Sequence, residues 1–547
     1  MSATGSPGTS PENAAMVQGV IDAARSGDFA RASELANAAI QKGVRHPVLF
    51  NARSTWFGMQ GRHEEALADL QVLRSAFPDD VTLLLKIGVC QMRLRRPKRA
   101  LQTFDEIVAR DPGNAQAHYQ RGAVFGMLGE TGAMKEAFDA ALARDPENVD
   151  ALAGMALYHA RSSEYEPAGR LSARALAHAP GHMVAQNVAL LVAIAEGTIG
   201  ASDGRLHHIL ENPLFAVGTP FGHGLNLALE EAGSSGDRAG RTEEAFAIWE
   251  ILNRRRYDAF LPQLGPERSV AQVRRRILEL KPYEPPPSSR VACPAAGHAF
   301  LLGFMRSGTT LLETVLAASE HVVALDEFDF LSEGVREYIV PRDGLEKLAR
   351  APDEALQPLR DSYWRSVREA GISYEGKVYL DKLPLNSLRL PLIARLFPEA
   401  KILLAIRDPR DVVFSCFRHS FEVGLQTFEY LRLDDCANYY AATMEFVELC
   451  RDRIPMSVHE HHYEKMVADF ETSVRSVCDF IGIAWDESLR NFGKASGVVN
   501  ERSVSASQVS KGLYAGASGQ WRRYQERLGV IYPILEPWVA RFGYAPT

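Results

Sequence analysis

Prolines recur at equal intervals in the first third of the sequence. Pro78, Pro112, Pro146 and Pro180 close four similar phrases, AFPDD, RDPGN, RDPEN and HAPGH. The interval matches the period, about 34 residues, of a helix–turn–helix unit that cannot bury its apolar face alone and stacks on its neighbours. The period therefore predicts an all-α repeat array in this part of the chain.

Small residues recur with the same period at three positions of the unit. The first position is the expected crossing point of the second helix, with Ala32, Ala66, Ala100 and Ala168, and with Met134 as the exception. The second is the matching point of the first helix, with Gly88, Gly122 and Ala156. The third is the turn between the two helices, with Gly27, Gly61 and Gly129. Glycine adopts the left-handed conformation of such a turn at low cost. The pattern resembles tetratricopeptide repeats, in some five units over residues 13–180.

The resemblance to tetratricopeptide repeats implies a concave surface that binds a protein or peptide. Such arrays also act as spacers or as dimer surfaces. We therefore expect a protein or peptide partner at the concave face of the array, with a homodimer as an alternative.

Other parts of the chain differ in character. The 547 residues correspond to about three or four domain-sized units at roughly 150 residues each. Residues 1–12 are polar and predict a disordered tail, whereas residues 181–281 keep a helical period without the closing prolines, as degenerate repeats or a cap would. Residues 282–290 contain three consecutive prolines and predict a stiff linker. Residues 291–547 then form a separate domain.

Charge and cysteine content exclude several classes of function. Lys plus Arg number 61 against 68 Asp plus Glu, so the whole chain has no electrostatic basis for coating nucleic acid or an anionic membrane. The six cysteines contain no C-x-x-C pair, which argues against a disulfide framework or a zinc site. The N-terminus has no secretory signal, and the longest apolar stretch is too short to span a bilayer. We expect a cytoplasmic protein.

A glycine-bounded loop follows the predicted linker. An apolar strand leads into Gly303-Phe-Met-Arg-Ser-Gly308, and a helical run begins at Thr309. The backbone N–H groups of such a loop and the positive end of the next helix cradle a phosphate. The spacing is that of a nucleotide-binding loop, but Thr309 occupies the position of the usual lysine, which disfavours an ordinary ATPase or GTPase. Arg306 supplies a cation instead, unless the loop is a structural turn that this arginine caps.

A second apolar strand, at residues 401–406, also ends in charge. Arg407 follows it directly, and Ser415 lies in the next helical run. Ligands of open α/β sheets bind at the carboxyl ends of the strands. Arg407 and Ser415 are therefore candidates to hold a second phosphate, with a salt bridge or cap at the helix start as the structural alternative.

Residues 299–326 and 376–417 together resemble the sulfotransferase family, whose donor is 3′-phosphoadenosine 5′-phosphosulfate. The resemblance implies a P-loop-like α/β domain with a central parallel sheet. The glycine loop is similar to the 5′-phosphosulfate loop of that family, and R-D-x-R-x-x-x-x-S to its 3′-phosphate motif. By matching position, the donor-binding residues are Arg306, Ser307, Gly308, Thr309 and Thr310 for the 5′ end, and Arg407 and Ser415 for the 3′ end.

Further positions resemble the tyrosylprotein sulfotransferases and their bacterial relatives fused to tetratricopeptide repeats. Glu327 follows Arg306 at the interval that separates the loop arginine from the catalytic base in that branch. Lys382 resembles the lysine that acts on the leaving phosphate, where negative charge grows. Tyr463, in a Tyr-Glu pair, and Ser505, in an S-x-x-Q-V run, resemble segments near the nucleotide.

Two assignments stay open within the resemblance. Asp326 or Asp329 is an alternative base to Glu327. A lysine that the branch carries before a late tryptophan corresponds to Gln520. Three residues are candidates to supply the missing charge, namely Lys511, Arg522 and Arg523.

We therefore predict a sulfotransferase that moves a sulfuryl group to a hydroxyl, for instance of a peptide tyrosine held by the repeats. Glu327 would be the base, with Lys382 and Arg306 on the leaving phosphate. We expect no metal, because Tyr463 stands where a zinc helix containing His459 would need its second histidine. The alternatives are a repeat scaffold whose sulfotransferase-like domain only binds nucleotide or has decayed, and a phosphoryl-transferring kinase.

Overall fold

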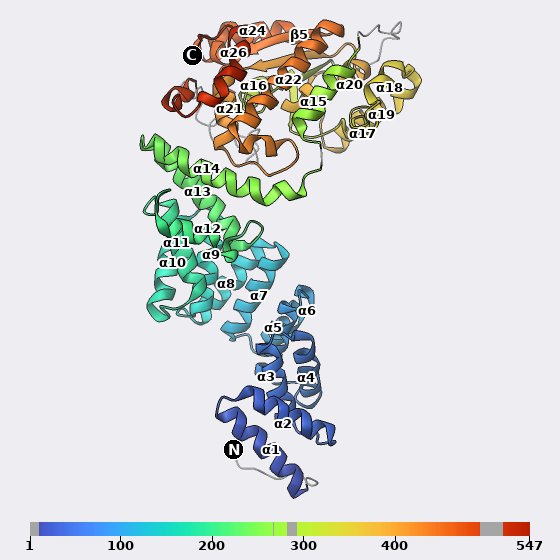
Figure 1. Cartoon of the computed structure of the whole chain (residues 1–547). Helices are drawn as coiled ribbons and strands as arrows, with labels where there is room; N and C mark the ends of the chain where they lie inside the picture. Colours follow the sequence, from blue (N-terminus) through green and yellow to red (C-terminus); the bar gives the residue numbers. More distant parts are fainter. Residues whose placement is uncertain (1–9, 266, 282–292, 493–517, 547) are drawn as a thin grey trace. The chain divides into compact units, whose positions relative to one another are not determined.

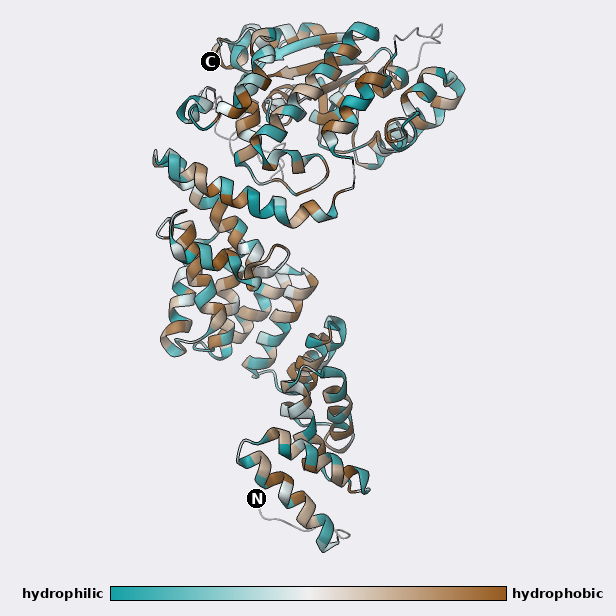
Figure 2. Cartoon of the chain, viewed as in Figure 1, coloured by the Kyte–Doolittle hydropathy of each residue, from teal (hydrophilic) through white to brown (hydrophobic). Residues whose placement is uncertain are grey.

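The computed structural model describes residues 10–265, 267–281, 293–492 and 518–546. The chain forms two compact units, residues 1–232 and 233–547 (Figure 1). Helices in both units carry hydrophobic and hydrophilic residues side by side (Figure 2). Among the described residues, no helix combines the length and the hydrophobicity of a membrane span.

The N-terminal unit is a series of helix pairs. The pairs are α1 (Pro11–Arg25) with α2 (Phe29–Gln41), α3 (Pro47–Met59) with α4 (His63–Ala76), α5 (Val81–Arg93) with α6 (Pro97–Arg110), α7 (Ala115–Leu128) with α8 (Thr131–Arg144), and α9 (Val149–Arg161) with α10 (Tyr165–His178). Helices α11 (Met183–Ala195) and α12 (Gly204–Glu211) and the turn η1 (Pro213–Phe215) follow. The predicted helical repeat is confirmed, and α1 begins two residues before the predicted start at residue 13.

The small residues of the repeat lie where helices touch. Ala66 and Ala100 are fully buried, and a Cβ at Gly88 or at Gly122 would overlap a phenylalanine ring of the second helix of the same pair. The turn glycines Gly27, Gly61 and Gly129 have φ of 79°, 72° and 77°, and Arg95 and Ser163 fill the remaining two turns with φ of 53° and 58°. The backbone thus keeps the period of the repeat even where glycine does not recur.

The C-terminal unit contains a parallel sheet of five strands among the described residues, in the order β2-β3-β1-β4-β5. The strands are β1 (Gly297–Gly303), β2 (Val322–Asp326), β3 (Val378–Lys382), β4 (Lys401–Ile406) and β5 (Ser457–His462). The predicted central parallel sheet is confirmed. Because all strands run the same way, the loops after β1, β2, β3, β4 and β5 meet at one edge.

Helices cover both faces of this sheet. They are α16 (Thr309–Ala317), α17 (Ser332–Tyr338), α18 (Gly344–Arg350), α19 (Asp353–Glu369), α20 (Leu390–Leu396), α21 (Pro409–Arg418), α22 (Leu433–Arg453), α23 (Tyr463–Ala468), α24 (Phe470–Ile481) and α26 (Tyr532–Arg541), with the short turns η3 (Pro384–Arg389), η4 (Thr427–Leu431), η7 (Gln520–Tyr524) and η8 (Gly529–Ile531). Along β1, Phe300 and Leu302 pack into the core that contains α20 and α22, whereas Ala299 and Leu301 pack into the core that contains α16 and α24. Buried strands with apolar residues on both sides are typical of such parallel sheets.

Two helices before the predicted linker belong to the sheet-containing unit. The division at residues 232 and 233 falls within α13 (Pro220–Arg238), so α14 (Thr242–Phe260), η2 (Leu261–Gln263) and α15 (Ser269–Glu279) group with the sheet. Trp249 of α14 packs against Phe414 and Tyr524, at ring-centroid distances of 5.8 and 5.7 Å. This division differs from the boundary proposed at 282–290, and those linker residues lie outside the described part of the chain.

Candidate functional site

The loop between β1 and α16 has the backbone that a phosphate cradle requires. Arg306 and Gly308 both have positive φ, at 68° and 96°. A Cβ at Gly308 would come within 2.6 Å of the Tyr463 ring, and a Cβ at Gly303 within 2.6 Å of the Ala405 carbonyl oxygen. Only glycine fits at the two ends of the loop. At Gly303 a side chain would meet the neighbouring backbone, and at Gly308 it would meet the Tyr463 ring and would also have to adopt a positive φ.

The hydroxyl residues of the loop lie at the start of α16. Ser307 is buried and its hydroxyl donates to the Phe304 carbonyl over 2.7 Å. Thr309, which is buried, and Thr310 are the first residues of the helix. The first backbone N–H groups of a helix have no partner within it and attract anions. The predicted loop residues therefore converge on one helix N-terminus.

Arg306 reaches from this loop to the helix that follows β4. Its Nε donates to Ser415 Oγ over 3.1 Å, and its Nη2 lies 3.3 Å from His419 Nε2. Burial and the charges of Arg306 and Arg418 hold the pKa of His419 well below its usual value. The neutral ring therefore donates from Nδ1 to the Ser415 carbonyl over 2.7 Å and accepts from Arg306 at Nε2.

Arg407, which belongs to the second predicted phosphate motif, contacts the loop of the first. Its Nη1 donates to the Arg306 carbonyl oxygen over 3.1 Å, and its guanidinium lies 5.1 Å from the centre of the Tyr463 ring. Burial, together with the charges of Arg407 and Arg418, lowers the pKa of Arg306 to about 10. A buried group of like charges of this kind favours an anion.

Tyr463 and Glu464 follow β5 at the same edge of the sheet. Glu464 accepts from the Asp408 backbone N–H over 3.1 Å and from the Tyr544 hydroxyl over 2.5 Å. Burial raises the pKa of Glu464. The Tyr-Glu pair thus fixes the backbone after β4 and places the Tyr463 ring against Gly308 and Arg407.

Lys382, at the end of β3, lies between two carboxylates. Its Nζ is 3.0 Å from Glu327 Oε1 and 3.2 Å from Glu313 Oε2. Lys382 and Glu313 are buried, whereas the Glu327 side chain is 39% exposed and its backbone has a positive φ of 45°. Glu313 belongs to α16, so one lysine connects the phosphate-loop helix with the predicted base. The sequence indicated neither this contact of Glu313 nor the contact of His419.

Asp329, one of the two alternative bases, has a different partner from Glu327. Asp329 forms a bidentate pair with Arg389, with N–O distances of 2.5 and 2.9 Å. Asp326 ends β2, and its backbone lies beside that of Lys382 in the sheet register. Of Glu327 and Asp329, Glu327 is the one whose carboxylate contacts Lys382.

A buried polar chain lies behind Lys382. The Tyr363 hydroxyl donates to Asp381 Oδ2 over 2.7 Å and lies 2.9 Å from His298 Nε2. Burial raises the pKa of Asp381 to about 7 and lowers that of His298 to about 3. Asp381 and Lys382 are neighbours on β3, so this chain supports the strand end that carries the lysine.

The comparisons with known proteins match both units. Residues 299–487 match the family model described as the sulfotransferase family, and residues 59–121 match that of the tetratricopeptide repeat. The matched sulfotransferase segment contains the glycine loop, Glu327, Lys382, Arg407, Ser415 and Tyr463. Over this segment, the resemblance to the sulfotransferase family that the sequence predicted is confirmed.

Similar proteins include an uncharacterized protein of Aquifex aeolicus, 27% identical over 44% of this chain and 33% of that protein. The protein-tyrosine sulfotransferase 1 of Danio rerio is 28% identical over 45% of this chain and 72% of the fish protein. The match to the Aquifex protein covers only a third of that protein's length. A solved sulfotransferase domain from the Synechococcus PCC 7002 olefin synthase is 23% identical, covers 44% of this chain and 91% of that chain, and has a TM-score of 0.31. A solved tetratricopeptide-repeat protein of Thermus thermophilus is 18% identical, covers 33% of this chain and 98% of that chain, and has a TM-score of 0.28.

The C-terminal end of the sheet-containing unit packs against α21. Asp411 accepts from the Gly519 and Trp521 backbone N–H groups over 2.6 and 3.0 Å. Gln520, between them, accepts through Oε1 from Arg418. Of the candidates for the missing charge, Arg523 pairs with Asp237 at 2.6 Å and Arg522 lies 5.5 Å from the Trp521 ring centre. Lys511 and Ser505 lie outside the described residues.

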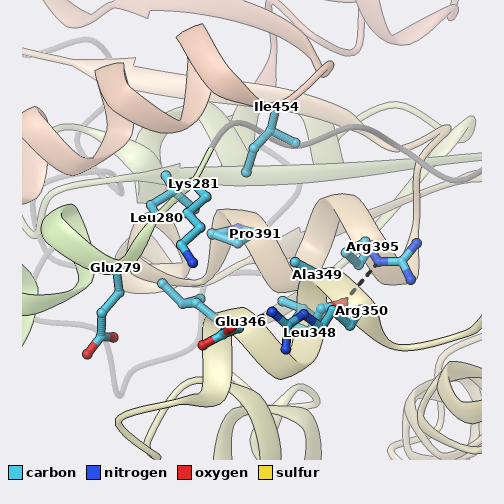
Figure 3. A pocket seen from close by; sticks show the side chains of 11 residues that line it. Glu279, Leu280, Lys281, Glu346, Leu348, Ala349, Arg350, Pro391, Arg395 and Ile454 are labelled. Atoms are coloured by element: carbon cyan, nitrogen blue, oxygen red, sulfur yellow. Dashed lines mark hydrogen bonds and ion pairs between the residues drawn. The ribbon is translucent and has the colours of Figure 1, made fainter.

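Two cavities of the domain lie away from these residues. One, of about 170 Å³, is lined by Leu280, which follows α15, and by α18 and α20 residues such as Leu348 and Arg395. Arg395 Nε donates to the Leu348 carbonyl over 3.4 Å (Figure 3). The other, of about 340 Å³, is lined by Gly297 and Lys401, at the amino edge of the sheet. Neither contains a predicted site residue. Within the described residues, His459 and its neighbours form no cluster of three or more metal-ligating side chains.

Proposed function

We propose that the C-terminal unit transfers a sulfuryl group from 3′-phosphoadenosine 5′-phosphosulfate to a hydroxyl acceptor. The contact of Arg306 with Ser415 carries the proposal, because it joins the two predicted phosphate motifs in one basic site. The match of residues 299–487 to the sulfotransferase family model supports it. The Lys382–Glu327 pair lies at the same edge of the sheet, where a reacting group would sit beside the donor.

Each residue of the site has a role in the proposed step. The acceptor oxygen forms a bond to sulfur while its proton passes to Glu327, and the bond from sulfur to the phosphate oxygen breaks. Lys382 and Arg306 neutralise the charge that grows on the leaving 5′-phosphate. Ser307, Gly308, Thr309 and Thr310 hold that phosphate, and Arg407 and Ser415 hold the 3′-phosphate. We also propose Tyr463 and Ser505 as nucleotide contacts.

The acceptor in this proposal is a tyrosine of a protein or peptide bound at the concave face of the repeats. Relatives of the sulfotransferase-family domain are named protein-tyrosine sulfotransferases, which supports this class of acceptor. A carbohydrate, a lipid or a small phenol would need the same base. The six cysteines, all free thiols, fit the reducing cytoplasm that we propose as the location.

Calorimetry with nucleotides tests the donor site. The whole chain is titrated with 3′-phosphoadenosine 5′-phosphate, with adenosine 5′-phosphate and with ATP plus magnesium. We expect binding of the first that needs its 3′-phosphate, and we expect Arg407→Ala to weaken it by about tenfold, as loss of a charged hydrogen bond does. A preference for magnesium ATP would favour a kinase, and no nucleotide binding would favour a scaffold; either result contradicts the proposal.

A further inference from the structure

We propose that Arg276, Tyr430 and Tyr439 form a buried site for a small inorganic anion of one charge, such as chloride. The three side chains come from α15, η4 and α22, and they are 8%, 1% and 0% exposed. Arg276 Nε and both tyrosine hydroxyls are buried atoms with no hydrogen-bond partner among the described residues. The proposed sulfuryl transfer uses none of them.

The three groups lie close to one another. Helix α22 packs against both α15 and η4 (Figure 1). The ring centres of Tyr430 and Tyr439 are 6.3 Å apart, and they lie 5.8 and 5.5 Å from the ring centre of Phe304. Burial raises the pKa of Tyr439, and the Arg276 charge opposes that rise, as a guanidinium near the hydroxyl does. The site therefore lies beside Phe304, the residue after Gly303.

The charge of Arg276 has no direct counterion. Within the part of the chain that the structure describes, no carboxylate forms an ion pair with its guanidinium. Both carboxylate oxygens of Glu279 lie 3.1 Å from Arg275 Nη1, and Asp329 pairs with Arg389. Burial and the charges of Arg275 and Arg389 lower the pKa of Arg276 to about 10. An anion stabilises a buried cation whose surroundings contain further cations.

The donors determine the kind of ligand. A guanidinium has only N–H donors, and a tyrosine hydroxyl donates to an anion. Water would satisfy these donors, but it would leave the guanidinium charge unbalanced. A dianion such as sulfate would bury a second negative charge near Glu429, a fully buried carboxylate that pairs with Arg268 and raises the pKa of Tyr439. Chloride brings one charge, accepts several hydrogen bonds and donates none.

The site lies between two contacts that already hold α15 in place. Arg268 pairs with Glu429 of η4 at the start of the helix, and Arg453 of α22 donates to a backbone carbonyl at its end. Arg276, between these contacts, has no polar partner of its own among the described residues. An anion that connects it to the two tyrosines supplies this contact. Such a ligand binds only the folded chain and stabilises it by mass action.

Thermal unfolding of the whole chain in different potassium salts tests the inference. Tryptophan fluorescence follows the sheet-containing unit, because five of the six tryptophans lie in residues 233–547. At equal ionic strength, chloride and bromide at about ten times their Kd should raise Tm by about 2–4 °C above gluconate, which is too large for the site. Arg276→Met should remove this difference. Arg274→Met, which removes the same charge from an exposed position of α15, should keep it.

Two further measurements cover the case in which Arg276→Met does not fold. Tyr439→Phe keeps the ring beside Phe304 and removes one hydroxyl, so the chloride concentration that gives half of the Tm shift should rise about fivefold. A crystal of the wild-type chain grown in bromide should show an anomalous peak between the Arg276 guanidinium and the Tyr439 hydroxyl.

Three results would overturn the inference. They are equal Tm values of the wild-type chain in chloride and gluconate, a chloride effect that persists in the folded Arg276→Met chain, and a bromide crystal with no ion at Arg276. None of these readouts involves the nucleotide, so they leave the proposed sulfuryl transfer to its own test.

Discussion

At the scale of single residues, a hydrogen bond connects the two predicted phosphate motifs directly. Arg407 donates to the carbonyl of Arg306, a residue 101 positions earlier with a positive φ. A left-handed residue other than glycine costs about 1 kcal/mol or more and persists where its surroundings hold it. The strand-end arginine is one of the groups that hold the loop in shape. Substitution of Arg407 is therefore expected to act on both phosphates.

Glu327→Ala should abolish sulfuryl transfer while leaving nucleotide affinity nearly intact. Loss of a general base lowers turnover by about 10²- to 10⁴-fold, because the acceptor keeps its proton. Lys382 retains its contact with Glu313, so the donor side of the site stays assembled. The measurement is turnover of labelled donor beside calorimetry with 3′-phosphoadenosine 5′-phosphate. Asp329→Ala is the control, and a Glu327→Ala chain that turns over normally while Asp329→Ala is inactive would move the base to Asp329.

Asp381 makes the stability of the chain depend on pH. Its folded pKa is about 7, against about 3.9 for an unfolded aspartate. Between these values the folded chain holds a proton that the unfolded chain has released, so this group makes the free energy of unfolding fall as the pH rises. Removing the Asp381 carboxyl should therefore lower the free energy of unfolding most at low pH.

Chemical unfolding of Asp381→Asn at pH 5 and pH 8 measures this dependence. The difference in the free energy of unfolding between wild type and variant should become smaller by on the order of 2 kcal/mol from pH 5 to pH 8. Asp361→Asn, on the exposed side of α19, is the control. A gap that stays constant with pH would show that Asp381 is ionised in the folded chain at both values.

At the scale of elements, the repeat could be predicted from the sequence because it depends on interactions between residues that lie close together in the chain. A turn of fixed length and a close helix crossing each need particular residue types, and these recur once in every unit of the repeat. The strand–loop–helix order at Gly303 and at Arg407 was visible for the same reason. The partners of Lys382 were not visible, because Glu313 and Glu327 meet it only when three separate elements are assembled.

The crossing glycines offer a test of the repeat geometry. Gly122→Ala should destabilise the array by about 1–3 kcal/mol, because the new methyl group overlaps the Phe138 ring. Gly132→Ala, also helical but with open space around it, should be neutral or stabilise the chain by about 0.5 kcal/mol. Urea unfolding followed by circular dichroism compares the two. Equal effects of both substitutions would contradict the close crossing of α7 and α8.

At the scale of the whole molecule, the sheet-containing unit extends further toward the N-terminus than the sequence indicated. Helix α14 has the same amphipathic period as the repeats, and three prolines after α15 suggested a break. The contacts that decide the grouping join residues far apart in the sequence, such as Asn253 with the Phe417 carbonyl and Arg268 with Glu429. No local pattern in the sequence reports such pairs.

Truncated chains test this grouping. A chain of residues 220–547 should unfold cooperatively, whereas one of residues 290–547 should not. The shorter chain loses Trp249 from the core and leaves Glu429 buried without Arg268, at a cost of about 3–5 kcal/mol for each loss. Thermal unfolding followed by circular dichroism distinguishes them. A cooperative transition in the shorter chain would restore the boundary at 282–290.

The position of Lys382 between Glu313 and Glu327 also bears on the order of events in a turnover. While Lys382 holds Glu327, the carboxylate is engaged and is a poor proton acceptor. A phosphate arriving at Lys382 competes for its ammonium group and frees Glu327, with Glu313 keeping the lysine in place. The base would thus become available only after the donor has bound. The pair acts as an interlock, and kinetics of this chain should show ordered addition, with the nucleotide entering before the acceptor.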